Sequence, residues 1–512
     1  MRSHNSLSSE NNLLIFLFAC LSLTLHLIGL NNYGINRDEY LHIALGNHLA
    51  FGYAEVPPFI ALVARFSVST FGDSAFAVRL IPAIFAALTV LTAGLIVKEI
   101  GGRRLAITLC GLALCFSPGF LATGYLLQPV VFDQFWWTLT FFLLIKYIYT
   151  GKTKYLLLLG PVIGLGLLTK YAILFIILSV ITGLLLTKQR NILSKKQVYI
   201  AAIIAFLIFL PNLIWQYLHH WPVMTHMKEL TETQLTHNTV GGFIKSQFIA
   251  QGTASLIWLP GLFLVFFHPK LNRLRWIGFS YLLLIAILIY FQGKDYYAFG
   301  VYPVLFAVSA YGIELITGRI NPVLKYAVAI LIILPNLLLL PLVIPVLPVN
   351  TTAAYLKTMH LDDLLYWEDR QKHPITQDYA DMIGWEEMTA ITAEAYQTIP
   401  EIHRKNTTIF AENYGEAGAI DHLGKKYNLP ASVSLSSSFT LWAPEQIPYQ
   451  YLIYIDDKGQ VEKTKPAYTN SMLVGTVSNA YSRENGTKIW LLSAPVKDIN
   501  PGYQSALKAK RP

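Results

Sequence analysis

Apolar runs long enough to cross a membrane recur through the first two thirds of the chain. A transmembrane helix needs about 17–25 mostly apolar residues. On that template we predict about eleven helices, near residues 13–30, 76–97, 105–125, 130–149, 154–168, 171–187, 198–215, 245–266, 276–292, 299–316 and 326–347. Charged residues make up only 13% of the chain, whereas a soluble domain carries about 25%. The predicted fold class is therefore a polytopic α-helical membrane protein.

Lysine and arginine gather in alternate loops between these runs, for example around residues 98–104, 146–154 and 188–196. Loops rich in these residues stay on the cytoplasmic side, so we predict a cytoplasmic N-terminus. An odd number of helices then places residues 350–512 on the outer side. The net charge of +9 follows from the same loops and does not indicate a nucleic-acid partner.

The composition becomes that of a soluble protein near residue 348. We therefore predict a transmembrane module at 1–347, with a first outer loop at 31–75, and a soluble extracytoplasmic α/β domain at 348–512. In that domain the pattern predicts a helix at Trp385–Thr398, a strand-to-helix turn at Asn413, and strands at Thr407–Phe410, Tyr451–Ile455, Ser471–Val477 and Lys488–Leu492.

The first outer loop is too long to be a simple connector. It contains an amphipathic stretch, Tyr40–Phe51, followed by Pro57 and Pro58. We expect this stretch to form a helix that lies in the membrane interface and is ended by the prolines.

Two adjacent carboxylates, Asp38 and Glu39, stand just before that stretch. Acids suit the N-terminus of a helix, so the pair can simply cap it. An acid that faces a water-filled cavity at the outer surface can instead take a proton from an acceptor hydroxyl as a general base. The sequence leaves both interpretations open, and Asp38 is the candidate base with Glu39 as its structural or electrostatic neighbour.

Glu55 lies on the same loop and is held by the two prolines behind it. Three acids on one loop can bind a divalent cation or share a proton. His219, at the outer end of the seventh predicted helix, is a candidate partner for Glu55 in such a site, although the spacing matches no zinc signature. A solvated acid and an interfacial histidine are the alternatives.

A second group of candidates lies on or near the predicted helices. Asp133 is a few residues into the fourth helix, where a carboxylate should face the protein interior and have a partner. Lys170 is either a side chain that reaches the membrane surface or a point charge that neutralises a lipid phosphate leaving group. Lys294 and Tyr297, on another outer loop, are candidates for the same substrate site.

No glycine-rich phosphate loop, nucleophile elbow or cysteine-pair motif is present, so the sequence does not support a nucleotide cofactor. Whether the protein uses a divalent metal stays open.

Several segments together resemble bacterial glycosyltransferase family 39, which is related to the protein O-mannosyltransferases and to the aminoarabinose transferase of lipid A. The segments are 37–40, 52–62, 72–82, 132–136, 164–170, 210–215 with His219 and residues 221–222, 294–297 with residues 302–303, 380–387 and 413–421. The resemblance covers nearly the whole chain, and its first-loop motif is the most specific part.

This resemblance implies a GT-C fold in a bacterial inner membrane, with a catalytic cavity at the outer surface and a polyprenyl-phosphate sugar as donor. It implies that Asp38 is the base of an inverting displacement and that Glu55 matches an acid that binds a metal in some relatives. The acceptor is a lipid such as lipid A, another glycan or a protein. The alternative function is a transporter or flippase of lipid-linked sugars, but such proteins usually show internal repeats and interrupted helices, and neither is evident here.

Overall fold

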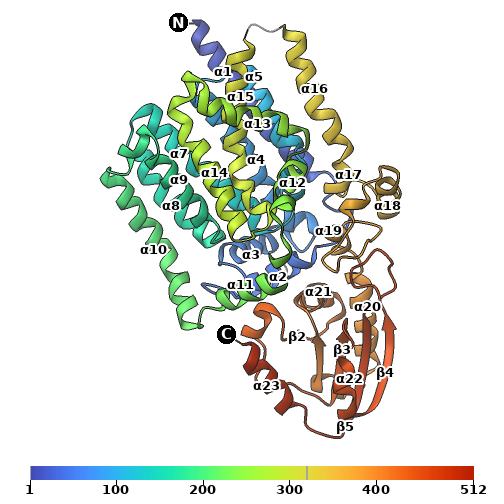
Figure 1. The fold of residues 1–512 in the computed structure, drawn as a ribbon. Helices are drawn as coiled ribbons and strands as arrows, with labels where there is room; N and C mark the ends of the chain where they lie inside the picture. Colours follow the sequence, from blue (N-terminus) through green and yellow to red (C-terminus); the bar gives the residue numbers. More distant parts are fainter. Residues whose placement is uncertain (1, 234, 319–320, 512) are drawn as a thin grey trace. The chain divides into compact units, whose positions relative to one another are not determined.

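The chain forms two compact units in a computed structural model that describes residues 2–233, 235–318 and 321–511 (Figure 1). The first unit comprises Met1–Leu30, Arg79–Trp215 and Met227–Val346. The second comprises Asn31–Val78, Gln216–His226 and Leu347–Pro512. The first outer loop and the C-terminal region therefore belong to one structural unit. The predicted domain division had assigned the loop to the transmembrane module instead.

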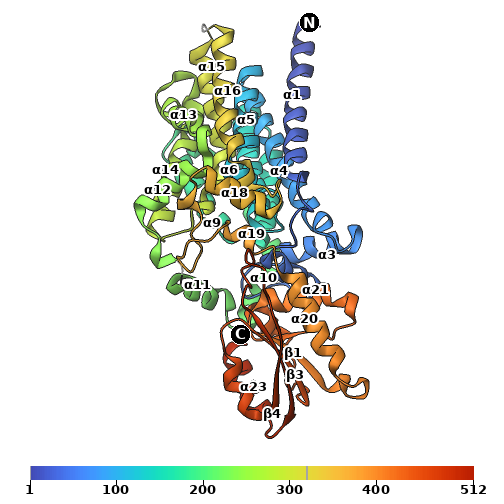
Figure 2. The ribbon, with the colours of Figure 1, turned by 90° about the vertical axis from the view of Figure 1, so that its right-hand side faces the viewer.

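The first unit is a bundle of helices, and its long helices run side by side in both ribbon views (Figures 1 and 2). The long and short helices of this unit are α1 (Arg2–Leu27), α4 (Ala75–Glu99), α5 (Arg104–Phe116), α6 (Pro118–Thr123), α7 (Pro129–Thr150), α8 (Lys154–Thr169), α9 (Ile173–Leu185), α10 (Lys196–Leu218), α11 (Pro222–Thr233), α12 (Val240–Gln251), α13 (Ser255–Phe267), α14 (Arg275–Tyr290), α15 (Tyr302–Thr317), α16 (Pro322–Leu338) and α17 (Leu340–Val343). Three of them, α4, α10 and α11, extend past the limits of the unit.

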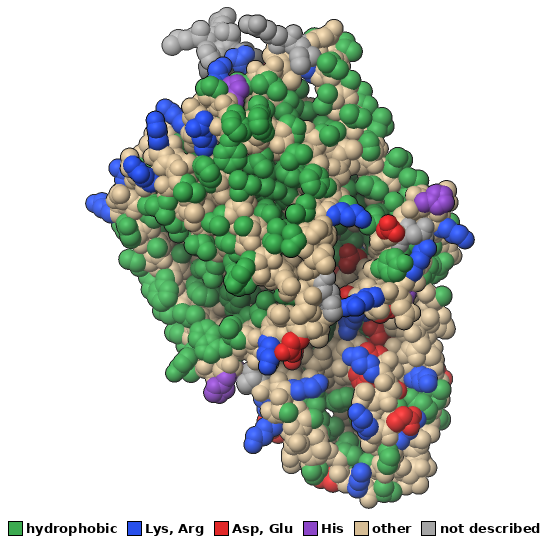
Figure 3. Space-filling model, in the orientation of Figure 1, with side chains coloured by type: hydrophobic (Ala, Val, Ile, Leu, Met, Phe, Trp, Pro, Cys, Tyr) green, Lys and Arg blue, Asp and Glu red, His purple; other side chains and the backbone are tan. Residues whose placement is uncertain are grey.

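Within the described part of the chain, six helical segments are long and apolar enough to cross a membrane, and five further apolar helices are shorter. Hydrophobic side chains cover much of the face of this unit that Figure 3 shows. Large apolar side chains such as Phe206, Leu207 and Phe263 are more than a third exposed on its helices, as expected of a surface that contacts lipid. The predicted polytopic helical fold is confirmed, whereas the number of about eleven helices stays a prediction.

The second unit contains a five-stranded sheet in the order β2-β1-β3-β5-β4. The strands are β1 (Thr407–Ala411), β2 (Val433–Ser434), β3 (Tyr451–Asp456), β4 (Tyr468–Thr476) and β5 (Lys488–Pro495). β1 pairs in parallel with β2 and β3, whereas β5 pairs antiparallel with β3 and β4. The predicted small α/β domain is thus confirmed, and the two-residue strand β2 is its unpredicted member.

Helices cover both faces of this sheet. The helices of the C-terminal region are α18 (Val349–Thr358), α19 (Gln377–Ala380), α20 (Trp385–Thr398), α21 (Tyr414–Leu423), α22 (Val461–Thr464) and α23 (Asn500–Lys510). Among them α20 packs on β3, β4 and β5, and α21 on β1 and β2. Figure 2 shows α20 and α23 on opposite sides of the strands. Phe410 packs with Tyr503 and Leu507 of α23 on one face, while Ile391 of α20 contacts Gly475 of β4. Side chains that alternate along each strand therefore enter two separate cores.

The first outer loop holds two helices, α2 (Arg37–Asn47) and α3 (Phe59–Phe71). The predicted helix Tyr40–Phe51 was wrong at both ends. Its start lies three residues earlier because Asn36 caps it. It ends well before the prolines because the Tyr53 hydroxyl bonds to the carbonyl oxygens of Leu45 and His48, both at 3.0 Å. The prolines instead precede α3, with Pro58 as its N-terminal cap.

Helices α2 and α21 pack closely because glycines line the contact. A Cβ atom on Gly418 would lie 2.9 Å from the backbone oxygen and from the Cβ of Tyr40. A Cβ on Gly415 would lie 2.5 Å from Cγ of Arg37. Because the Tyr40 contact includes backbone, it cannot be relieved by a side-chain rotation.

We therefore expect Gly418→Ala to destabilise the second unit by about 1–3 kcal/mol, the usual cost of overpacking. Gly502 of α23 is the matched control, since a Cβ there meets nothing within 4 Å. Gly502→Ala should stabilise the protein by roughly 0.5–1 kcal/mol through helix propensity. Thermal unfolding of the detergent-solubilised proteins measures both, and equal melting temperatures for the two variants would contradict the close packing.

Candidate functional site

The start of α2 places Asp38 and Glu39 in different surroundings. The side-chain oxygen of Asn36 accepts a hydrogen bond from the Asp38 amide at 2.9 Å, and Glu39 Oε2 accepts one from the Asn36 amide at 2.8 Å. This reciprocal arrangement is a capping box. Glu39 is fully buried in it, whereas Asp38 is partly exposed. Glu39 therefore has the capping position that the sequence left open for the pair, and a catalytic role for Asp38 stays a prediction.

Asp38 contacts a tyrosine from the distant end of the chain. The hydroxyl of Tyr414, the first residue of α21, donates a 2.8 Å hydrogen bond to Asp38 Oδ1 across 376 residues of sequence. The Arg37 guanidinium lies 4.9 Å from the centre of the Tyr414 ring. Desolvation and the negative charge of Asp38 raise the pKa of Tyr414, so the phenol stays protonated and acts as the donor.

Asp381 holds the first residue of α2 through its backbone carbonyl. The Asp381 carbonyl accepts hydrogen bonds from the Arg37 amide at 2.9 Å and from the Trp385 indole at 2.8 Å. Its carboxylate pairs with Arg483 at 3.2 Å. Segments 37–40, 380–387 and 413–421, which carry part of the family resemblance, thus meet in the second unit.

Glu55 is bound by two serine hydroxyls. One of its oxygens accepts a hydrogen bond from Ser437, and the other accepts one from Ser438 at 2.5 Å. His219 is partly buried in the short segment that joins this unit. The serines use only part of the hydrogen-bonding capacity of Glu55. A metal held by Glu55 and His219 stays a prediction, and we derive no step through a metal.

Three carboxylates elsewhere in the second unit lie close together. Glu416, Asp457 and Glu484 each offer an oxygen within 4.8 Å of the others. Among the described residues this is the set with the oxygen ligands that a hard cation prefers. Glu416 is also the capping residue of α21, since its Oε2 accepts a hydrogen bond from the Asn413 amide at 3.1 Å. The positive charge of Arg37 acts on both Glu416 and Glu484.

The first unit brings four predicted substrate residues together. Lys170, at the end of α8, has its Nζ 4.3 Å from the centre of the Tyr297 ring. Asp133 of α7 is buried, accepts a 2.8 Å hydrogen bond from Trp137, and interacts electrostatically with Lys170. Lys294 lies near enough for its charge to act on Lys170 as well. Two lysines lie near two carboxylates here, because the charge of Lys294 also acts on Asp295. The lysines can still donate hydrogen bonds to an anionic ligand.

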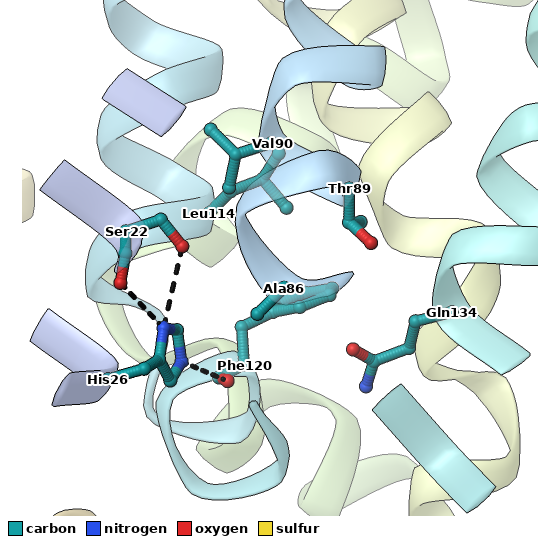
Figure 4. Close-up of a pocket in the computed structure, with 8 residues that line it drawn as sticks. All are labelled: Ser22, His26, Ala86, Thr89, Val90, Leu114, Phe120 and Gln134. Carbon is teal, nitrogen blue, oxygen red and sulfur yellow. Dashed lines mark hydrogen bonds between the residues drawn. The ribbon is translucent and has the colours of Figure 1, made fainter. Parts of the chain in front are cut away.

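The first unit also contains a small cavity beside His26 (Figure 4). It is lined by Ser22, His26, Ala86, Thr89, Val90, Leu114, Phe120 and Gln134. The His26 ring spans two backbone carbonyl oxygens, with Nδ1 2.7 Å from that of Ser22 and Nε2 3.2 Å from that of Phe120. This ring joins α1 to α6, so the cavity is part of the helix packing.

Sequence reasoning missed Tyr414 and the two serines that hold Glu55. Tyr414 belongs to the segment 413–421, and the only local signal was the cap that starts the helix there. Nothing in that signal indicates a contact with Asp38, because the partner is remote in sequence.

Comparisons with known proteins find similarity to glycosyltransferases. Residues 55–215 match the family model described as dolichyl-phosphate-mannose-protein mannosyltransferase. RgtD of Rhizobium johnstonii, a lipid A galacturonosyltransferase, is 31% identical over 207 residues, which cover 38% of this chain and 41% of the length of RgtD. The chain is related to the GT-C glycosyltransferases. The predicted resemblance is thereby confirmed.

Two solved structures share the fold. ArnT of Cupriavidus metallidurans bound to undecaprenyl phosphate superposes with a TM-score of 0.60 at 14% identity, over 94% of this chain and 98% of ArnT. The oligosaccharyltransferase of Archaeoglobus fulgidus, in complex with Zn and sulfate, gives a TM-score of 0.51 at 13% identity, over 89% of this chain and 69% of that protein. The likeness in fold to ArnT therefore extends over nearly the whole chain.

The Asp133–Lys170 pair leads to a stability prediction. Lys170 is only partly buried, so removing its charge should cost less than about 3–5 kcal/mol, the loss from a fully buried pair. The cost arises because the buried Asp133 carboxylate loses its electrostatic interaction with Lys170. We expect Lys170→Met to lower the melting temperature and the double variant Asp133→Asn/Lys170→Met to recover most of the loss. Lys270→Met, at an exposed position, is the control. A double variant no more stable than Lys170→Met would contradict the pairing.

The acidic residues of the second unit lead to a pH prediction. Burial and a hydrogen bond with Asp457 raise the pKa of Glu412 to about 8. The folded protein therefore keeps a proton that the unfolded chain releases, and stability should fall as the pH rises from about 5 to 8. Glu412→Gln mimics the protonated acid, so its melting temperature should fall less steeply over that range. Parallel pH profiles for the two proteins would refute this.

Proposed function

We propose that the protein is an inverting glycosyltransferase that moves a sugar from a polyprenyl-phosphate donor to a lipid acceptor at the outer face of the bacterial inner membrane. The fold likeness to ArnT, whose structure holds undecaprenyl phosphate, supports the donor class and carries this proposal. The sequence likeness to a lipid A galacturonosyltransferase supports a lipid acceptor. The mannosyltransferase model leaves a glycan or a protein as alternative acceptors.

In this proposal Asp38 is the general base. The acceptor oxygen forms a bond to the anomeric carbon of the sugar, and its proton passes to the Asp38 carboxylate. The bond between the anomeric carbon and the phosphate oxygen breaks, and the electron pair leaves with polyprenyl phosphate. One displacement inverts the anomeric centre. Glu39 keeps α2 in place through its cap and so supports Asp38.

The leaving group is a phosphate that is already anionic, so the reaction needs positive charge more than an acid. Lys170 and Lys294 are the charges that we propose for binding an anionic group of the substrate. Tyr297 holds Lys170 through its ring without neutralising it. The charge of Asp133 acts on Lys170, and Glu55 is a further proposed substrate-binding residue.

Lipid extracts test the proposal. Cells that carry the wild type, Asp38→Asn, Asp363→Asn or no protein are compared by mass spectrometry. We expect one glycolipid that differs from its precursor by a hexose, pentose or amino sugar in the wild type. Its amount should fall about 10²–10⁴-fold in Asp38→Asn, the usual share of a general base. Asp363→Asn, at an exposed position, should match the wild type.

Two other outcomes would test sugar transfer and the role of Asp38 separately. Identical glycolipids and glycoproteins in the wild-type and empty strains would exclude sugar transfer and leave the flippase alternative. A product that requires the protein but not the Asp38 carboxylate would exclude Asp38 as base and indicate an acceptor that is itself a phosphate, because such an acceptor needs no proton removed.

A further inference from the structure

We infer that Tyr414, carried by the C-terminal region of the chain, is a positioning residue that orients the Asp38 carboxylate for proton abstraction. The inference rests on the proposed function of Asp38 and adds a residue that the reaction scheme above does not use. It makes α21 a functional support of the reaction and not only a covering element of the sheet.

The hydrogen bond itself is the first argument. At 2.8 Å, the contact from the Tyr414 hydroxyl to Asp38 Oδ1 has the usual length of an O–H···O hydrogen bond. It fixes the rotation of the carboxylate about its Cβ–Cγ bond. That rotation decides where the second oxygen points and therefore which acceptor proton it can reach.

The tyrosine ring is held as firmly as its hydroxyl. Arg37 lies over the ring at 4.9 Å, and the Arg37 backbone amide is bonded to Asp381. Arg37 and Asp38 are neighbours in the first turn of α2, so the two contacts act on Tyr414 from adjacent residues. A ring held on its face and at its hydroxyl has little freedom to rotate away.

The two helices that carry these residues are built alike and pack without a gap. Asn36 and Glu39 form the capping box of α2, and Asn413 and Glu416 form that of α21. Each box fixes the first turn of its helix, where Asp38 and Tyr414 lie. Gly415 then lets α21 approach Arg37. The donor and the carboxylate are thus set by rigid elements, as a preorganised catalytic group requires.

Tyr414→Phe is the direct test, because phenylalanine keeps the ring beneath Arg37 and removes only the hydroxyl. Tyr33→Phe is the matched control: its hydroxyl makes a buried 2.9 Å hydrogen bond to Thr352 in the same unit. The measured quantities are the initial rate of glycolipid accumulation after induction, the melting temperature, and the affinity of the purified protein for undecaprenyl phosphate.

We expect Tyr414→Phe to lower the rate by about 10–100-fold, as for a misplaced catalytic group. Its affinity for undecaprenyl phosphate and its melting temperature should stay close to those of Tyr33→Phe. This separation of rate from binding distinguishes positioning from a purely structural role. A rate within twofold of the wild type, or a loss of rate that follows a loss of binding and stability, would overturn the inference.

Asp38→Asn, measured in the same strains, separates this inference from the proposed function. If the product is lost in Asp38→Asn and unchanged in Tyr414→Phe, only the role of Tyr414 fails. If Asp38→Asn retains the wild-type rate, the base assignment fails and the role of Tyr414 fails with it. Absence of any product that depends on the wild-type protein would refute the transfer reaction itself.

Discussion

The close contact between α2 and α21 is the constraint on which the second unit depends. Gly415 and Gly418 allow the helices to approach until Tyr40 touches the backbone of α21. This approach brings Tyr414 within hydrogen-bond distance of Asp38 and Arg37 within reach of the Tyr414 ring. A residue larger than glycine at these positions would separate the helices, and the Asp38 carboxylate would lose the partner that orients it.

The paired acids at the start of α2 show how one dipeptide serves two purposes. Glu39 turns back to the Asn36 amide and satisfies a donor that a helix start leaves without a partner. Asp38, one residue earlier, points to a different element. Since neighbouring residues on a helix face different directions, a capping acid and an acid available for chemistry can stand side by side. The capping and catalytic interpretations of this pair are therefore compatible.

Local patterns predicted the elements better than the site. The helix Trp385–Thr398 and the strands around residues 407, 451, 471 and 488 were found from periodicity, because each is encoded within a few residues. Strand β2 was not predicted because two residues are too few to show the alternation of apolar and polar residues. The end of α2 was misplaced because the Tyr53 hydroxyl, a few residues beyond the helix, bonds to the carbonyl oxygens of Leu45 and His48, and the apolar pattern does not show such a bond. The bond from Tyr414 to Asp38 joins distant segments, and no local pattern encodes such a contact.

The two units use aromatic rings to hold cations, but with different electrostatic results. In the first unit Lys170 lies over Tyr296 and Tyr297, with Lys294 near and Asp133 as the opposing charge. In the second, Arg37 lies over Tyr414 and faces several carboxylates. Rings hold a cation without cancelling its charge. The ring contacts therefore leave the charge of Lys170 to interact with Asp133 and with an anionic group, whereas the positive charge of Arg37 interacts with Asp38 and the nearby acids of the second unit.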